Sequence, residues 1–183
     1  MDSKEGWNSK KTKRVVWAVV AVVIVAAAAY VFYDLNGHSF SLCDRQVLVI
    51  ATSSMDGDVT EYEIDSFPAN TLIMIEKFDT YEEKMELKVG DVISFKVGTL
   101  LDHHRIIQDH LDQGFVITQG DNAPYTETVY IGSINGKVIG TNHPLGLLVD
   151  FVHHNVILLI FVLIAALAVV EYWQWMKKGS KKK

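Results

Sequence analysis

The chain has 183 residues, a net charge of −5, 49% hydrophobic residues and a mean hydropathy of +0.17. This length allows one modest folded domain, and the hydropathy is high for a fully soluble protein. The one cysteine, Cys43, excludes an internal disulfide framework, so the folded domain must be stabilised by its hydrophobic core.

The N-terminal part predicts a membrane anchor. Residues 1–14 form a polar, basic leader, and residues 15–33 are an uncharged run of 19 residues, which as a helix is roughly 28 Å long and matches a hydrocarbon core. A cleavable signal peptide is the alternative, because residues 26–29 are alanines that suit a cleavage site. The run is longer than an ordinary signal sequence and ends in an aromatic cluster at residues 30–33, which favours a transmembrane helix.

The central segment, residues 34–153, predicts a compact and mainly β domain. Apolar or alternating runs indicate short strands at residues 46–51, 71–76, 92–97, 105–107, 115–118 and 131–141. A turn at residues 112–114 predicts a hairpin, and Asn135-Gly136 is a second two-residue turn signal. The charged stretch 80–87 is the one candidate for an amphipathic helix, so we expect six or seven strands.

The C-terminal part predicts a second membrane helix. Residues 142–146 break the strand pattern, residues 154–176 form the expected transmembrane helix, and residues 177–183 are a basic tail. Both ends are basic, so the positive-inside rule places them in the cytosol and the central domain outside it. Residues 34–150 carry 19 acidic and 7 basic side chains, which argues against nucleic acid as a partner.

Ser54 ends a hydroxyl-rich turn, Thr52-Ser53-Ser54-Met55, after the first predicted strand of the domain. Serines in such turns ordinarily bond to their own backbone. A serine nucleophile needs an adjacent base, most plausibly imidazole, which changes protonation near neutral pH. Asp121 likewise has an ordinary interpretation as a turn residue after a strand.

Seven histidines are candidates for the base. His103 and His104 open a predicted strand, where side chains alternate between faces, so one of the pair points at a given site and the other is expected at the surface. Neighbours on opposite faces chelate one ion poorly, and we expect no metal and no cofactor. Five others flank the membrane segments or lie in a polar loop and are expected at the surface or the membrane interface: His38, His110, His143, His153 and His154.

The order and spacing of Thr52-Ser53-Ser54-Met55, His104-Arg105 and Gly120-Asp121-Asn122 resemble the type I signal peptidase family, in its archaeal and endoplasmic-reticulum branch. The flanking segments at residues 87–95 and 136–140 are also similar to that family. The resemblance covers roughly residues 46–141. It implies a signal-peptidase-like β catalytic domain.

The resemblance implies a role for each matched residue. Ser54, before Met55, is the nucleophile, and His104 is the general base, at a position that bacterial members fill with lysine. Thr52 and the backbone N–H of Ser54 form the oxyanion hole. Asp121 orients the histidine or supports the fold.

Two positions depart from the family pattern. Glu127 stands where the family carries an aspartate, so it either replaces that carboxylate with a longer side chain or weakens its role. Gly57 stands where the family has a proline, and we expect a looser turn there.

The expected function is that of a multi-pass serine endopeptidase in the cell membrane or the endoplasmic reticulum. It removes signal peptides from exported preproteins on the extracytosolic side. Its partners are then secretory preproteins, the lipid bilayer, and the translocon or other secretion subunits. Two alternatives remain: a catalytically silent, membrane-anchored scaffold subunit of a secretion complex, and a self-cleaving serine protease on the same fold.

Overall fold

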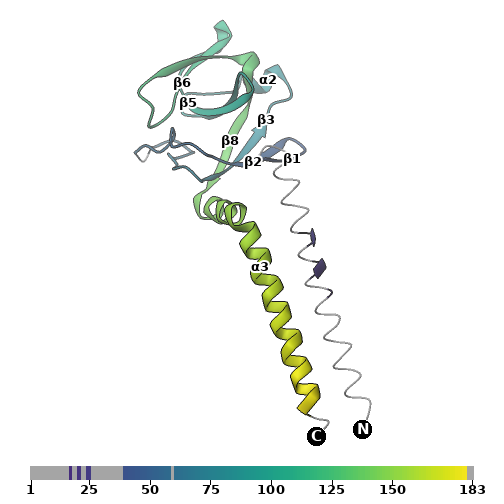
Figure 1. Ribbon diagram of the computed structural model, residues 1–183. Coiled ribbons are helices and arrows are strands. Elements are labelled where there is room, and N and C mark those ends of the chain that lie inside the picture. Colours follow the sequence, from purple (N-terminus) through teal and green to yellow (C-terminus); the bar gives the residue numbers. More distant parts are fainter. Residues whose placement is uncertain (1–16, 18–19, 22–23, 26–38, 59, 181–183) are drawn as a thin grey trace. The chain divides into compact units, whose positions relative to one another are not determined.

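The computed structural model describes residues 17, 20, 21, 24, 25, 39–58 and 60–180 (Figure 1). The predicted leader at 1–14, most of the predicted helix at 15–33, His38 and the last three residues of the tail lie outside them. The chain divides into two compact units. One unit combines Met1–Leu35 with Phe151–Lys183, and the other is Asn36–Asp150.

The unit Asn36–Asp150 is built on one antiparallel sheet of eight strands, in the order β1-β2-β3-β8-β4-β5-β6-β7 (Figure 1). The prediction of a mainly β fold is confirmed, with more strands than expected because β1 and β7 carry few aliphatic residues. The strands are β1 (Ser39–Leu42), β2 (Arg45–Val49), β3 (Leu72–Lys77), β4 (Val92–Val97), β5 (Leu100–His110), β6 (Phe115–Gln119), β7 (Thr126–Tyr130) and β8 (Ile134–Asn142).

Both faces of the central strands are covered by apolar side chains. Successive residues of β4 belong to different clusters, since Val92 packs in one core and Ile93 in the other. Where a strand is covered on both sides, the residues that point to either face are buried. His103 and His104 on the neighbouring β5 are both buried, so the alternative interpretation of the pair, a surface histidine next to a half-buried one, is wrong.

One of the two predicted turns is confirmed. β5 and β6 form a hairpin through the short 3-10 helix η1 (Leu111–Gln113) and Gly114, whose φ of 86° is left-handed. Asn135-Gly136 is not a turn, because both residues lie inside β8. A Cβ on Gly136 would meet the carbonyl oxygen of Glu76 on β3, so this glycine serves the close approach of two strands.

The charged stretch 80–87 contains a single helical turn, α2 (Tyr81–Lys84). Thr80 caps it, and the Glu83 carboxylate accepts hydrogen bonds from the backbone N–H groups of Thr80 and Asp79 at 2.9 and 2.8 Å. These bonds lower the pKa of Glu83. A second 3-10 turn, η2 (Ile131–Ser133), links β7 to β8.

A long helix, α3 (His143–Ser180), follows β8 directly. The predicted break at 142–146 is instead the helix start. The Asn142 side chain accepts a bond from the backbone N–H of Leu145 at 2.9 Å, and Pro144 lies in the first turn, where its missing N–H is tolerated. The His143 Nδ1 lies 3.1 Å from the Thr71 hydroxyl of the sheet unit.

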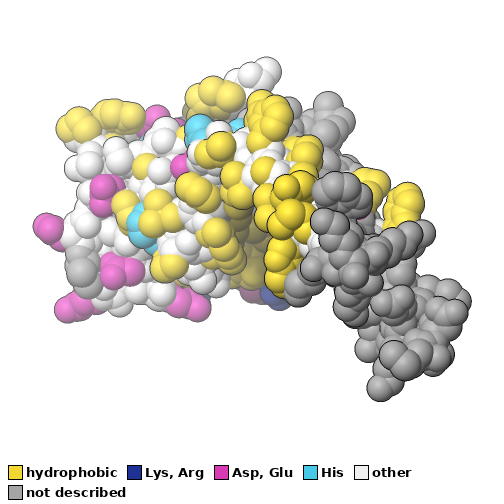
Figure 2. All heavy atoms as spheres, turned by 60° about the horizontal axis from the view of Figure 1, so that its bottom comes forward, with side chains coloured by type: hydrophobic (Ala, Val, Ile, Leu, Met, Phe, Trp, Pro, Cys, Tyr) yellow, Lys and Arg dark blue, Asp and Glu magenta, His cyan; other side chains and the backbone are white. Residues whose placement is uncertain are grey.

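The stretch His143–Trp173 of α3 is long and apolar enough to cross a membrane. Its most exposed side chains include Ile157, Phe161 and Val169. Figure 2 shows hydrophobic side chains gathered in large patches on the face in view, whereas acidic side chains are scattered singly. An apolar helix surface of this size calls for a nonaqueous environment or a partner.

The two glycines of β8 allow a matched test of the strand packing. Gly136→Ala places a Cβ 2.8 Å from Ile75 Cγ2 and against the Glu76 backbone, whereas Gly140→Ala meets nothing within 4 Å. We expect Gly136→Ala to lower the free energy of unfolding by roughly 1–3 kcal/mol, as overpacking does. Gly140→Ala should change it by less than about 1 kcal/mol. Denaturant titration of the full chain in detergent measures both, and equal effects would contradict this packing.

Candidate active site

Ser54 is held in the loop between β2 and β3 by the residue that follows it. Met55 is 1% exposed and packs in the core with Ile50 and Phe67. Its carbonyl accepts a hydrogen bond from the Phe67 backbone N–H at 2.8 Å. Because the side chain and the carbonyl of Met55 are both fixed, Ser54 is positioned without belonging to a strand. The Ser54 hydroxyl lies 3.3 Å from the Thr52 hydroxyl.

His104 lies within β5 with 1% of its side chain exposed. Its Nδ1 is 3.2 Å from Oε2 of Glu127, which extends from β7 across the intervening strand β6. Its Nε2 is 3.7 Å from Oδ1 of Asp102, and its ring centroid is 5.9 Å from that of Phe95. If Nδ1 carries the proton and donates it to Glu127, Nε2 keeps the lone pair that a general base needs.

Gly120 lies where the Ser54 loop meets His104. A Cβ on Gly120 would lie 2.6 Å from the Ser54 carbonyl oxygen and 3.0 Å from His104 Nε2, so these two atoms flank one glycine. The Asn122 backbone N–H donates to the same Ser54 carbonyl at 2.8 Å. Any side chain at position 120 would push the loop away from the histidine.

Gly57 has the same role on the other side of the loop. A Cβ there would lie 2.8 Å from the carbonyl oxygen of Asp121 and 2.9 Å from its Cβ. Gly57 is therefore a point of close packing between the Ser54 loop and the loop after β6, and the expectation of a looser turn stays a prediction. The glycine is required by contact rather than by backbone conformation.

Asp121 bonds to Arg105 rather than to His104. Its two carboxylate oxygens accept from Arg105 Nε at 2.8 Å and Nη2 at 2.6 Å, and the Ser66 hydroxyl donates to it at 2.7 Å. Arg105 Nη1 donates to the carbonyls of Ile64 and Gly90 at 2.8 and 2.9 Å. With Arg105 3% exposed and Asp121 10% exposed, this pair ties β5 to three loops. Of the two roles foreseen for Asp121, these contacts correspond to the structural one.

The structure thus brings three of the predicted residues together. The Ser54 backbone carbonyl and His104 Nε2 flank Gly120, Glu127 lies at the other ring nitrogen, Nδ1, and the Thr52 hydroxyl adjoins that of Ser54. Within the described part of the chain, no hydrogen bond joins the Ser54 hydroxyl to His104. Catalytic hydrogen bonds commonly form or tighten only in the substrate complex, so the lack of this bond is compatible with a nucleophile and its base.

Some contributing residues were missed at the sequence level. Asp102 precedes His104 by two positions in a strand, so the strand period alone puts both on one face. No sequence pattern indicated that the Arg105 guanidinium would pair with the Asp121 carboxylate. Nothing in the sequence indicates that Gly120 separates the Ser54 loop from the histidine, since that depends on how two loops meet.

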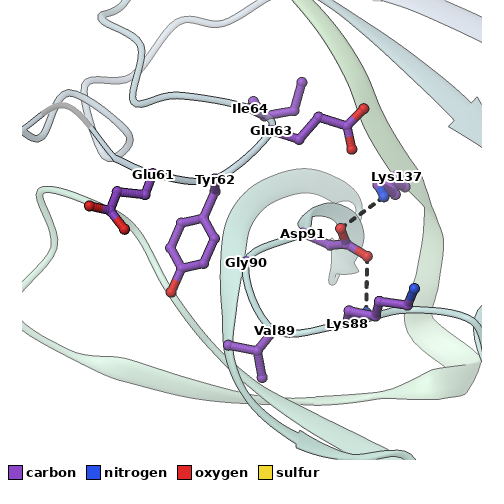
Figure 3. Close-up of a pocket in the computed structure, with 9 residues that line it drawn as sticks. All are labelled: Glu61, Tyr62, Glu63, Ile64, Lys88, Val89, Gly90, Asp91 and Lys137. Carbon is purple, nitrogen blue, oxygen red and sulfur yellow. Dashed lines mark hydrogen bonds and ion pairs between the residues drawn. The ribbon is translucent and has the colours of Figure 1, made fainter.

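A pocket of about 250 Å³ lies beside the Arg105 pair and contains none of the predicted site residues (Figure 3). Lys137 Nζ is 2.8 Å from Asp91 Oδ1 in its wall. The Tyr62 ring covers the Arg105 guanidinium at 5.0 Å. The pocket is lined by Glu61, Tyr62, Glu63, Ile64, Lys88, Val89, Gly90, Asp91 and Lys137.

No family model and no curated protein sequence matches the chain.

His103 provides a pH-dependent test of the burial of β5. Its side chain is buried beside the buried Ser94 of β4, and neither His103 Nδ1 nor the Ser94 hydroxyl has a hydrogen-bond partner among the described residues. Burial lowers the pKa of His103 from 6.5 to about 4, an effect that Asp102 opposes and His104 reinforces.

Between pH 6.5 and 4 the unfolded chain therefore binds a proton that the folded chain does not, so stability falls as the pH falls. We expect this residue to cost about 2 kcal/mol of unfolding free energy between pH 7 and pH 5. In denaturant titrations, the unfolding free energy of His103→Leu should fall by about 2 kcal/mol less than that of the wild type between pH 7 and pH 5. His110→Leu, the same change at the half-buried end of β5, should keep the wild-type dependence. A wild-type slope in His103→Leu would refute the assignment.

Proposed function

We propose that this chain is a membrane-anchored serine endopeptidase that removes signal peptides from exported preproteins, with the catalytic domain of a signal peptidase. The observation that carries the proposal is the approach of the Ser54 loop to His104 Nε2 on the two sides of Gly120, with Glu127 at His104 Nδ1. This arrangement supplies a nucleophile, a base and a carboxylate that fixes the ring of the base.

In the proposed reaction, Ser54 Oγ attacks the scissile carbonyl and His104 Nε2 accepts its proton. The same proton then passes to the leaving amine, and a water molecule, activated by His104, hydrolyses the acyl-enzyme. Glu127 holds the imidazole through Nδ1. The Thr52 hydroxyl and the Ser54 N–H bind the developing oxyanion.

The proposed location follows from the distribution of charge and apolar residues. α3 provides one helix of membrane-spanning length. The basic residues at both ends support a multi-pass arrangement with the β domain outside the cytosol, in the cell membrane or the endoplasmic reticulum. Signal sequences lie in the membrane and present their cleavage sites at its outer face, where this domain would meet them. Translocon components or other secretion subunits are proposed as further partners.

Preprotein processing by the full chain in liposomes tests the mechanism. We expect Ser54→Ala and His104→Ala to lower the processing rate by roughly 10³-fold or more, because each removes an essential part of one catalytic unit. Ser53→Ala is the matched control, since it removes a hydroxyl one residue away, and it should cleave at nearly the wild-type rate. Undiminished cleavage by Ser54→Ala or His104→Ala would refute the proposed mechanism.

The two carboxylates have separate expected effects. Glu127→Gln should lower kcat by roughly 10²–10⁴-fold while changing the unfolding free energy by less than about 1 kcal/mol, because its contact with His104 is half-exposed. Asp121→Asn should cost about 3 kcal/mol of stability, because it leaves the buried Arg105 without its counter-charge. Paired measurements of kcat and denaturant stability separate the roles, and a reversed pattern would show that Asp121 orients the base.

A catalytically silent scaffold subunit is the second candidate. The observation that favours it is the Ser54 hydroxyl bonding to Thr52 without a bond to His104. A serine-directed acylating inhibitor distinguishes the two candidates, because only an activated Ser54 forms a covalent adduct. Mass spectrometry of the labelled chain, with Ser54→Ala as control, gives the answer, and it also reveals any internal cut made by a self-cleaving protease.

A further inference from the structure

Asp102 lies beside the base on β5 and has no role in the proposed reaction. It precedes His104 by two positions, so the two side chains share one face of the strand. Its Oδ1 is 3.7 Å from His104 Nε2, which is too long for a hydrogen bond. The Asp102 side chain is 39% exposed, whereas the imidazole is buried. A ligand in the site can therefore reach this carboxylate, while the protein fixes the ring.

The Asp102 carboxylate has no lysine or arginine partner. Its Oδ1 accepts a hydrogen bond from the His103 backbone N–H at 2.8 Å, and no lysine or arginine in the described part of the chain forms an ion pair with it. Lys96, on the neighbouring strand β4, is in register with Leu101 and therefore points to the opposite face of the sheet. Beside a neutral imidazole, Asp102 thus presents an uncompensated negative charge to the site.

The proposed reaction produces an amine at the ring nitrogen that Asp102 faces. His104 Nε2 passes the Ser54 proton to the scissile nitrogen, the C–N bond breaks, and a neutral α-amine leaves. To receive that proton, the amine nitrogen must come within roughly 2.6–3.2 Å of Nε2. A free α-amino group has a pKa of roughly 7.7–8.0, so at pH 7 it takes up a further proton from water and becomes an ammonium. The new amino terminus therefore gains a positive charge close to Asp102.

We propose that Asp102 binds the α-ammonium group of the newly formed mature chain, so that the site holds this product after the cut. The inference rests on the proposed function, because that reaction brings the amine to Nε2. An ammonium between Nε2 and Asp102 donates to the carboxylate and to the lone pair of the ring. An acetylated amino terminus is uncharged and has one N–H, so it cannot make both bonds. Mature chains with a free amino terminus therefore compete with preproteins for the site.

Peptide binding to Ser54→Ala tests the site without catalysis. The probe is a peptide with the first residues of a mature exported protein, labelled at its carboxyl end, and the control probe is the same peptide with an acetylated amino terminus. Fluorescence anisotropy with the full chain in detergent at pH 7 should show that the free peptide binds about three- to tenfold more tightly. At about pH 9.5, where the α-amine is neutral, this preference should disappear.

Asp102→Asn in the Ser54→Ala background isolates the charge. Asparagine keeps an oxygen that can accept from the His103 N–H but removes the negative charge, so the two peptides should bind with nearly equal affinity. Asp112→Asn, the same change at an exposed carboxylate on η1, should keep the preference for the free peptide. A preference that survives Asp102→Asn, or equal binding of both peptides to Ser54→Ala, would overturn the site.

Preprotein processing in liposomes separates the ammonium site from the proposed function. The free peptide should inhibit the wild type at an about three- to tenfold lower concentration than the acetylated peptide, and Asp102→Asn should respond to both peptides alike. Processing by the wild type with equal inhibition by both peptides would refute the ammonium site and leave the peptidase intact. A wild type that processes no preprotein but prefers the free peptide through Asp102 would retain the site and lose the proposed function.

Discussion

The arrangement of the candidate site depends on the buried ion pair between Arg105 and Asp121. A guanidinium that is 3% exposed is costly to bury unless its donors are paired, and here both Asp121 oxygens and two backbone carbonyls accept them. Arg105 follows His104 directly on β5, and Asp121 follows Gly120. The pair therefore fixes His104 and the neighbouring loop together.

The position of the Ser54 loop depends indirectly on the Arg105–Asp121 pair. It has no strand partners at Ser54, and it is held by the burial of Met55 and by the loop of residues 120–122, which donates to the Ser54 carbonyl and packs against Gly57. Loss of the ion pair would release the surface against which Ser54 is positioned. Asp121 can therefore affect the position of Ser54 without touching the imidazole.

Features that depend on neighbouring residues in the chain, such as strands and turns, could largely be predicted from the sequence. Strand periodicity located the main strands of the sheet, and the hairpin after β5 follows from a turn at Gly114. Asn135-Gly136 misled because a glycine that allows two strands to approach has the same signature as a glycine in a turn. Which carboxylate reaches His104 could not be predicted, since Glu127 arrives across β6 and that depends on the order of three strands.

Two carboxylates beside one imidazole impose opposite demands on it. Glu127 on Nδ1 favours the tautomer with a free Nε2, whereas Asp102, 3.7 Å from Nε2, favours an N–H at that position instead. In the proposed mechanism, the Ser54 hydroxyl donates to Nε2 and thereby selects the tautomer that Glu127 favours. Since Glu127 is the carboxylate within hydrogen-bond distance of the ring, the geometry already leans towards that tautomer before any substrate arrives.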